Sequence, residues 1–291
     1  MTEKAKLGFI GLGLMGGPIA AKLLENGYPM TVWGRSEARL APFRDGGAAV
    51  AASPAELARE SDVVFLCVTD AAAVEAVVFG DGGLAEGAGA DQVMIDHSTI
   101  GAEATRDIAG RLEAATGAAW IDAPVSGGAP GVANKTLVVM AGGEAEAFAR
   151  VAPVVESFAG RFTLMGPSGA GQTTKLINQA LCGVGFALLA EVAKLAENAG
   201  VDVNAIPPAL AGGRADSTLL QEYLPHMANR DFTPRGTPRI MLKDLEMVAD
   251  LARATDTTMP VTALAREIFR LMLQTGRGDA DNAAMVTLYE S

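Results

Sequence analysis

A glycine-rich segment near the start of the chain has the spacing G-x-G-x-x-G. It consists of Gly11, Leu12, Gly13, Leu14, Met15 and Gly16. An apolar run precedes the segment and a helical pattern follows it. In that context such glycines allow a tight turn to approach a pyrophosphate at a helix N-terminus. A structural turn without a ligand is the simpler interpretation, but the context favours a dinucleotide site.

The residues after the second apolar run indicate which dinucleotide would bind. An NAD site usually has a carboxylate about 20 residues beyond the glycines. Here that stretch is Gly34, Arg35 and Ser36. Arg35 offers a forked guanidinium and Ser36 a hydroxyl to a 2′-phosphate. A solvated surface arginine is the alternative, but the missing carboxylate favours NADP, with NAD also possible.

Two later segments carry further polar groups. The hydroxyl of Ser126 and the N–H groups of Gly127 and Gly128 follow an apolar run and could hold a carboxylate, although a plain turn fits equally well. Lys175 lies three residues before Asn178 and four before Gln179, so the three share a helix face. Such a lysine either extends to solvent or performs acid–base chemistry in a cleft. The residues alone favour the solvent interpretation.

Metal and disulfide chemistry are disfavoured by the small number of suitable residues. The chain has two cysteines, Cys67 and Cys182, and two histidines, His97 and His226. These are too few for a disulfide framework or a typical zinc site. His97 follows an apolar run and could touch a cofactor, but a loop histidine with a packing role is more common, and we assign it no function.

Composition narrows the class of protein. The chain has 291 residues, of which 49% are apolar, so disorder is excluded. Its 23 basic and 34 acidic residues give a net charge of −11, which disfavours binding to nucleic acid or anionic membranes. No signal peptide is evident at the N-terminus, and the longest apolar run, 180–190, is shorter than the roughly 18 residues of a membrane span. We expect a soluble, cytoplasmic protein.

Short apolar runs alternate with helical patterns through the first part of the chain. Continuous apolar runs are typical of strands buried on both faces of a parallel sheet. The expected strands are 7–10, 30–33, 63–68, 93–96, 119–122 and 137–140. This alternation predicts an α/β Rossmann domain with a doubly wound, mostly parallel sheet.

The pattern changes to helices after residues 162–164. A stretch without proline predicts one helix over 171–198, in which Gly183 and Gly185 indicate close packing of another helix or a ligand. Further helices are expected at 205–212, 217–228, 243–255 and 260–274, without a convincing strand. We therefore predict a dinucleotide-binding domain at 1–165 and an all-α domain at 166–291, joined by the long helix.

Four segments in this order resemble the β-hydroxyacid dehydrogenase family, which includes 3-hydroxyisobutyrate dehydrogenase, tartronate semialdehyde reductase and the plant glyoxylate/succinic semialdehyde reductases. They are 8–18, 122–128, 169–179 and 243–245, and the resemblance spans nearly the whole chain. It implies a Rossmann domain, a long interdomain helix and a helical domain that makes the dimer contact. A homodimer or homotetramer is therefore expected.

The resemblance also implies roles for individual residues. Lys175 is implied to be catalytic, with Asn178 orienting it, while Ser126, Gly127, Gly128 and Asn178 contact the substrate. We place Gln179 with these substrate contacts. Thr99 and Lys243 match further cofactor contacts of the family, and we add Val68 to them. The pair Arg35 and Ser36 resembles the NADP-preferring members, whereas Gly34 replaces an asparagine found in many of them.

The expected function is hydride transfer between NADP(H) and a short 3-hydroxy acid or its semialdehyde, a small-molecule carboxylate. An imine reductase shares the architecture but usually has another residue in place of Lys175. A non-catalytic dinucleotide-binding module is the third alternative. The presence of Lys175 favours the first interpretation. The choice of substrate is expected to depend on the helical domain, where Arg214, Asp216 and Lys243 could shape or charge the pocket.

Overall fold

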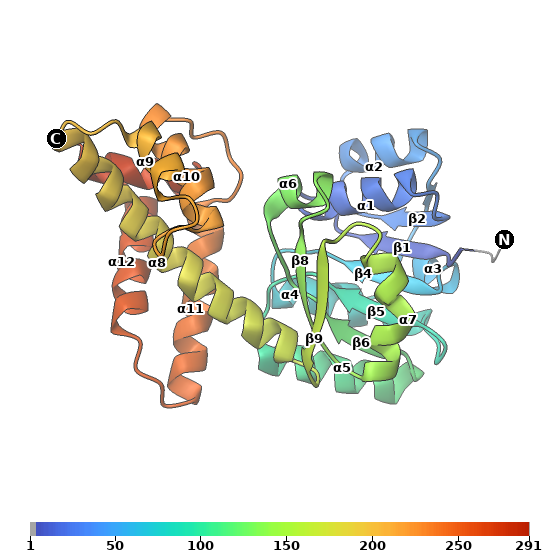
Figure 1. The fold of residues 1–291 in the computed structure, drawn as a ribbon. Helices are drawn as coiled ribbons and strands as arrows, with labels where there is room; N and C mark the ends of the chain where they lie inside the picture. Colours follow the sequence, from blue (N-terminus) through green and yellow to red (C-terminus); the bar gives the residue numbers. More distant parts are fainter. Residues whose placement is uncertain (1–3, 291) are drawn as a thin grey trace. The chain divides into compact units, whose positions relative to one another are not determined.

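The computed structural model describes residues 4–290, and their backbone contacts divide the chain into two units. The N-terminal unit extends to Lys175 and the C-terminal unit begins at Leu176. Helix α8, Ala170–Asn198, starts in the first unit and continues into the second (Figure 1). The division falls ten residues after the boundary expected at 165, and the functional extents 1–165 and 166–291 stay a prediction.

A nine-stranded sheet forms the centre of the N-terminal unit within the described residues. Its order is β3-β2-β1-β4-β5-β6-β8-β7, and β9 pairs with β8. The first six strands in this order run parallel, while β8 is antiparallel to β6 and β7. The strands are β1 Leu7–Ile10, β2 Met30–Trp33, β3 Ala49–Val50, β4 Val63–Leu66, β5 Val93–Asp96, β6 Ala119–Asp122, β7 Val125–Ser126, β8 Val138–Gly142 and β9 Arg161–Gly166. The mostly parallel, doubly wound sheet is thus confirmed.

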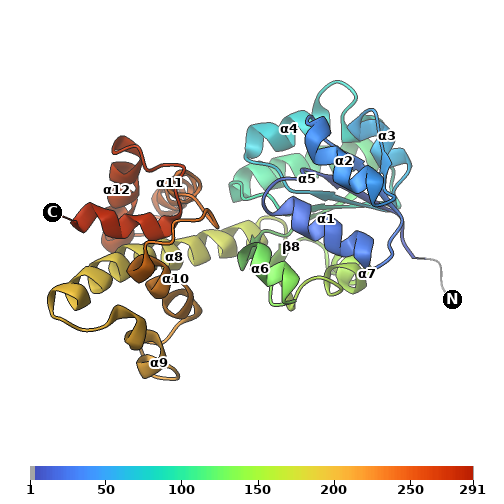
Figure 2. The same ribbon diagram turned by 90° about the horizontal axis from the view of Figure 1, so that it is seen from above.

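Helices cover both faces of this sheet, with α1, α6 and α7 on one face and α3, α4 and α5 on the other (Figure 2). Alternate residues of each apolar run belong to different clusters, as Phe9 and Phe65 pack on one face and Ile10 and Leu66 on the other. This explains why the strands are continuously apolar rather than alternating. The helices are α1 Gly16–Glu25, α2 Glu37–Asp45, α3 Pro54–Arg59, α4 Ala71–Phe79, α5 Ala102–Thr116, α6 Gly128–Ala133 and α7 Ala145–Val155, with a 3₁₀ turn η1 at Leu84–Glu86.

The C-terminal unit is helical over its described residues. Besides α8 it contains α9 Ile206–Leu210, α10 Thr218–Asn229, α11 Pro238–Ala254 and α12 Pro260–Gln274, with 3₁₀ segments η2 Val203–Ala205 and η3 Asn282–Tyr289. A Cβ atom built on Gly185 would lie 2.4 Å from Leu219, and one on Gly183 would lie 2.9 Å from Leu245. The expected close packing of another helix against these glycines is therefore confirmed.

Judged by length and composition alone, helix α8 is also long and apolar enough to cross a membrane. Half of that apolar segment is buried inside the structure. Its buried residues, including Phe186, Ala190 and Ala193, contribute to the core of the C-terminal unit together with Leu224 and Phe269. We therefore interpret α8 as a core helix.

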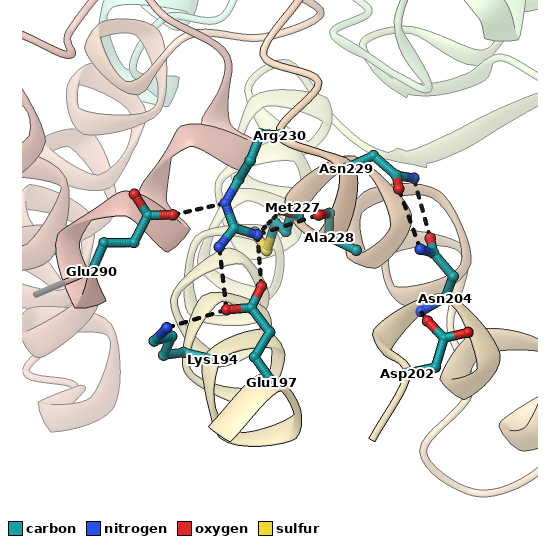
Figure 3. Close-up of polar contacts among 9 residues, drawn as sticks. All are labelled: Lys194, Glu197, Asp202, Asn204, Met227, Ala228, Asn229, Arg230 and Glu290. Carbon is teal, nitrogen blue, oxygen red and sulfur yellow. Dashed lines mark hydrogen bonds and ion pairs between the residues drawn. The ribbon is translucent and has the colours of Figure 1, made fainter. Parts of the chain in front are cut away.

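An arginine at the end of α10 connects three parts of the C-terminal unit (Figure 3). Arg230 adopts the left-handed conformation at φ 53° and caps α10. Its guanidinium pairs with Glu197 near the end of α8 at 2.7 Å and with Glu290 at 2.7 Å. It also donates to the carbonyl of Met227 in the last turn of α10. Since Arg230 holds the pKa of Glu197 below its usual range, the ionised pair stabilises this corner at neutral pH.

Candidate active site

The register of the parallel strands brings the predicted cofactor segments to one edge of the sheet. Ile10 pairs with Trp33 and Leu66, Leu66 pairs with Asp96, and Asp96 pairs with Asp122. These five residues end their strands at the same level, so the loops that follow them are neighbours. The glycine segment follows β1, which lies between β2 and β4, because the chain runs outward from β1 to β2 and β3 and then returns to β4 on the other side of β1. Open α/β sheets bind ligands at such a switch point.

The glycines of the G-x-G-x-x-G segment serve different purposes. Gly11 has φ 98°, and a Cβ there would lie 2.2 Å from the carbonyl oxygen of Cys67. A Cβ on Gly16 would lie 1.9 Å from the carbonyl oxygen of Gly11. Both are therefore required by packing. Gly13 is different, because among the described residues its Cβ would meet only the guanidinium of Arg39, at 3.9 Å. The room at Gly13 is what the close approach of a pyrophosphate requires.

The loop after β2 and the start of α2 present guanidinium groups and one hydroxyl. Arg35 and Ser36 are exposed, and Ser36 precedes α2 without a side-chain cap bond to any described residue. The next carboxylate, Glu37, is paired with Arg44 at 2.5 and 3.2 Å, which reduces its repulsion of an anion. Arg39 places a guanidinium beside the glycine segment, with its Nη1 3.9 Å from a Cβ built on Gly13. Sequence reasoning missed Arg39, although its position four residues after Arg35 at a helix start was a usable signal.

The loops after β4 and β5 are joined by a hydrogen bond. The backbone N–H of Val68 donates to Oγ of Ser98 at 2.9 Å, so Val68 and Thr99 lie in connected loops. His97 is buried there, and its Nδ1 donates to the carbonyl of Ala123 at 2.6 Å. Burial lowers the pKa of His97 to about 4. The ring is therefore neutral near pH 7 and packs against aromatic side chains.

The two glycines expected to hold a carboxylate need their unusual backbone conformations. Gly127 has φ 123° and Gly128 has φ 61°, values that side chains other than glycine rarely adopt. They follow Ser126, which ends β7, and lead into α6. The conformation turns the chain sharply at the same end of the sheet as the glycine segment. It accounts for the glycines whether or not a ligand binds.

A buried carboxylate anchors the beginning of α8. Asp122 is fully buried, and its oxygens accept from the N–H groups of Gly169 at 2.8 Å and Gln172 at 2.9 Å. Burial raises the pKa of Asp122, and these N–H groups oppose the shift. A Cβ on Gly142 or Gly171 would approach the carboxylate within 2.8 Å. Both glycines therefore make room for Asp122, to which sequence reasoning assigned no role.

Lys175 lies one turn beyond Gln172 on α8 and is 8% exposed. The expectation that it extends to solvent, drawn from the residues alone, is therefore wrong. Asn178 is partly buried, and its amide nitrogen donates to Oε1 of Gln179 at 2.9 Å. Because of the three-residue spacing, Lys175 lies about 4.5 Å along the helix axis from Gln172. It is thus anchored close to the strand end at Asp122.

The remaining predicted residues lie within the C-terminal unit. Gln179 is buried and donates to Asp244 at 2.6 Å, and Lys243 lies 3.3 Å from the same carboxylate. The amide of Gln179 is thus engaged with Asp244. Asp216 accepts from the N–H of Gly212 at 2.7 Å. Arg214 is exposed.

Comparison with known proteins identifies the family. The model for the NAD-binding domain of 6-phosphogluconate dehydrogenase matches residues 6–166. A second model, described as NAD-binding of NADP-dependent 3-hydroxyisobutyrate dehydrogenase, matches residues 169–289. The chain belongs to the β-hydroxyacid dehydrogenase family. It is therefore an NAD(P)-dependent oxidoreductase, as the sequence predicted.

Relatives of this dehydrogenase match it over nearly their whole lengths. The 2-hydroxy-3-oxopropionate reductase of Escherichia coli K12 is 34% identical, covering 98% of this chain and 97% of the relative. The L-threonate dehydrogenase of Cupriavidus necator is also 34% identical, covering 97% and 95%. A crystal structure of 3-hydroxyisobutyrate dehydrogenase from Salmonella typhimurium has a TM-score of 0.88 at 32% identity, covering 98% and 100%. An imine reductase from Pseudomonas, at 21% identity and a TM-score of 0.65, shares the fold alone.

The different roles of the glycines in the dehydrogenase predict different mutant phenotypes. Gly13→Ala should leave the melting temperature nearly unchanged and raise the NADPH Kd at least about tenfold, because the methyl group occupies ligand space (about 1.4 kcal/mol). Gly16→Ala should instead cost about 1–3 kcal/mol of folding free energy. Thermal unfolding and NADPH fluorescence titration measure both effects.

Gly110→Ala is the matched control, because a Cβ at this position in α5 has no neighbour within 4 Å among the described residues. It should leave the NADPH Kd unchanged. Normal NADPH binding by a folded Gly13→Ala variant would show that the pyrophosphate does not approach this glycine.

Proposed function

We propose that the enzyme prefers NADP(H) and interconverts a short 3-hydroxy acid and its semialdehyde. The observation that carries the proposal is the convergence of the glycine segment, the loop after β2 and the anchored start of α8 at one sheet edge. The relative named for 2-hydroxy-3-oxopropionate supports the semialdehyde class, and the relative named for L-threonate supports a short hydroxy acid. We propose 1–165 as the cofactor domain and 166–291 as the substrate and dimer domain.

Lys175 is the proposed proton donor and acceptor. When bound, the nicotinamide supplies or accepts the hydride. In reduction, the Lys175 ammonium donates a proton to the oxygen of the substrate carbonyl as that oxygen becomes an alcohol. In oxidation, the Lys175 amine accepts the proton from the hydroxyl. Asn178, on the same helix face, orients the lysine and contacts the substrate.

The substrate carboxylate is proposed to bind away from the reacting carbon. The hydroxyl of Ser126 and the N–H groups of Gly127 and Gly128 hold it, and Gln179 adds a further contact. The positive-φ turn of the two glycines fixes these N–H groups before substrate binds. Their proposed role is therefore to orient the substrate rather than to take part in the reaction. Arg214, Asp216 and Lys243 are proposed to tune the choice of substrate.

The dinucleotide is proposed to bind along the loops of the sheet edge. Backbone groups of Gly11, Leu12, Gly13, Leu14, Met15 and Gly16 hold the pyrophosphate, while Val68, Thr99 and Lys243 complete the contacts. Arg35 and Ser36 hold the 2′-phosphate. The pairing of Glu37 with Arg44 supports this preference, because it partly neutralises the carboxylate nearest to the phosphate site in sequence.

A homodimer or homotetramer is also proposed. Two helices of the C-terminal unit expose large apolar side chains at helical spacing, which indicates surfaces that partner subunits cover. They are Ile177, Leu181, Leu188 and Leu195 on α8, and Val261, Leu264 and Leu271 on α12. We place the enzyme in the cytoplasm, consistent with Cys67 and Cys182 forming no disulfide among the described residues.

The function is tested by assaying C3 and C4 semialdehydes and hydroxy acids with both cofactors, in the wild type and in Lys175→Ala. Loss of the proton donor should lower kcat by about 10²–10⁴-fold. NADPH binding should persist, because its main contacts lie elsewhere. Lys175→Arg should not restore turnover, since a guanidinium stays protonated and differs in shape. Near-normal turnover in Lys175→Ala would assign the proton to another group.

Cofactor preference should follow Arg35. Arg35→Asp should raise the NADPH KM about 10–100-fold, as expected for the loss of a charge-assisted hydrogen bond (roughly 1.5–3 kcal/mol), while the NADH KM changes much less. Arg59→Asp is the matched control, because Arg59 is exposed at the end of α3, where the chain enters β4 at the end of that strand away from the glycine segment, and its guanidinium donates to the carbonyl of Glu86. Steady-state kinetics with both cofactors decide the point. A wild type that prefers NADH by kcat/KM would refute the 2′-phosphate assignment.

Light scattering at micromolar concentration should show a dimer or tetramer. Leu188→Glu, at a residue 56% exposed, should shift the enzyme toward monomer because a charge would be buried in the subunit contact. Val201→Glu alters an exposed apolar residue that belongs to neither of the two apolar sets on α8 and α12, and it should have no such effect. A wild type that is monomeric at full activity contradicts the proposal.

A further inference from the structure

The buried side chain of Gln172 bridges two segments that the proposed function assigns to different tasks. Its Nε2 donates to the carbonyl of Ser98 at 2.8 Å, and its Oε1 accepts from the N–H of Ile100 at 3.1 Å. The two backbone groups flank Thr99, the proposed cofactor contact. Gln172 itself is fully buried. One amide therefore holds the backbone on both sides of Thr99.

The backbone of Gln172 is also held by a hydrogen bond. Its N–H donates to the buried carboxylate of Asp122 at 2.9 Å, and the same carboxylate accepts from Gly169. Ser98 is tied in turn, since its N–H donates to Asp96 and its hydroxyl accepts from the N–H of Val68, each at 2.9 Å. Every group named here lies in the N-terminal unit. The network connects the strand ends of β4, β5 and β6 to the first turn of α8.

We propose that Gln172 is a positioning residue that sets the spacing between the cofactor loop at Thr99 and the catalytic Lys175. The inference rests on the proposed function for the roles of Thr99 and Lys175. It adds that the amide of Gln172 transmits the position of one to the other. Lys175 follows Gln172 by about 4.5 Å along the same helix, so a shift of this turn moves the ammonium group. Misplacement by about 1 Å can cost about 10²-fold in rate.

Gln172→Met tests the proposal, because it keeps the length of the side chain and removes both hydrogen bonds. We expect kcat to fall about 10–100-fold, while the NADPH Kd changes less than about threefold, because the pyrophosphate and 2′-phosphate contacts remain. Amide exchange at Ile100 should accelerate. A role in fold stability alone would lower the melting temperature and leave kcat per folded enzyme unchanged.

Thr174→Val is the matched control. Its hydroxyl bonds to the carbonyl of Ala170 within α8, so its loss removes a bond of the same helix start without touching the Thr99 loop. It should leave kcat and Ile100 exchange unchanged.

A second variant keeps the test decisive if Gln172→Met folds poorly. In Gln172→Glu, a protonated carboxyl can donate to Ser98 and accept from Ile100 as the amide does, whereas a carboxylate cannot donate. Because residue 172 is fully buried and its backbone N–H donates to the Asp122 carboxylate, the pKa of this new carboxyl should be raised. Its kcat relative to wild type should therefore recover as pH falls and decline as pH rises.

Three outcomes would overturn the proposal: unchanged kcat in Gln172→Met despite faster Ile100 exchange, unchanged Ile100 exchange, or a higher NADPH Kd at constant kcat. A flat relative pH profile for Gln172→Glu would do the same. Failure of the proposed function is a separate result. It would be seen as a wild type without nicotinamide-dependent turnover on the substrate panel, or as full activity in Lys175→Ala.

Discussion

The parallel register of five short strands is the constraint on which the rest of this molecule depends. Ile10, Trp33, Leu66, Asp96 and Asp122 end their strands side by side. Each following loop therefore begins at the same edge, whatever its length or sequence. A shift of one strand by one residue would turn its side chains to the opposite face and bury the wrong set. The apolar pattern that specifies the core thus also aligns the loops that carry the predicted site residues.

The carboxylate of Asp122, at the end of β6, joins the start of helix α8 to this aligned edge of the sheet. Asp122 offers two oxygens to the N–H groups at the start of α8, which have no partner within the helix itself. A negative charge at this place is also favoured by the helix dipole. Burial opposes the charge and raises the pKa of the group. The hydrogen bonds from the start of α8 offset this cost of burial. They also fix where α8 begins, and hence where Lys175 lies.

Much of the fold could be predicted because its signals are local. The apolar runs gave β1, β2, β5 and β6 with their observed bounds, and α12 was expected at Pro260–Gln274 as found. The short strands β3 and β7 were not predicted, because two residues are too few to show an apolar pattern. Helix α11 starts at Pro238, five residues before its expected start. The signal was present, since Thr237 caps the helix and proline occupies its first position.

The site was less accessible to sequence reasoning, because its decisive contacts join distant residues. The bond from Gln172 to Ile100 spans 72 positions and that from Gly169 to Asp122 spans 47. Spacing rules cover single helices and turns, so neither partner could be named in advance. Lys175 illustrates the same limit, since only the family resemblance distinguished it from a solvated lysine. The motifs pointed to the glycines with positive φ, but only the neighbouring atoms in the structure show why each position requires glycine.

The contrast between the exposed loop after β2 and the closely packed surroundings of Asp122 bears on how such an enzyme can diverge. Arg35 and Ser36 are exposed and lie outside the hydrophobic clusters, so their replacement leaves folding nearly untouched. Gly142 and Gly171 enclose Asp122 so closely that any side chain would collide with it. Evolution can therefore retune the loop after β2 by single substitutions, each of which yields a foldable protein. The enclosure of Asp122 changes only when several residues change together, and it should drift far more slowly among descendants of this sequence.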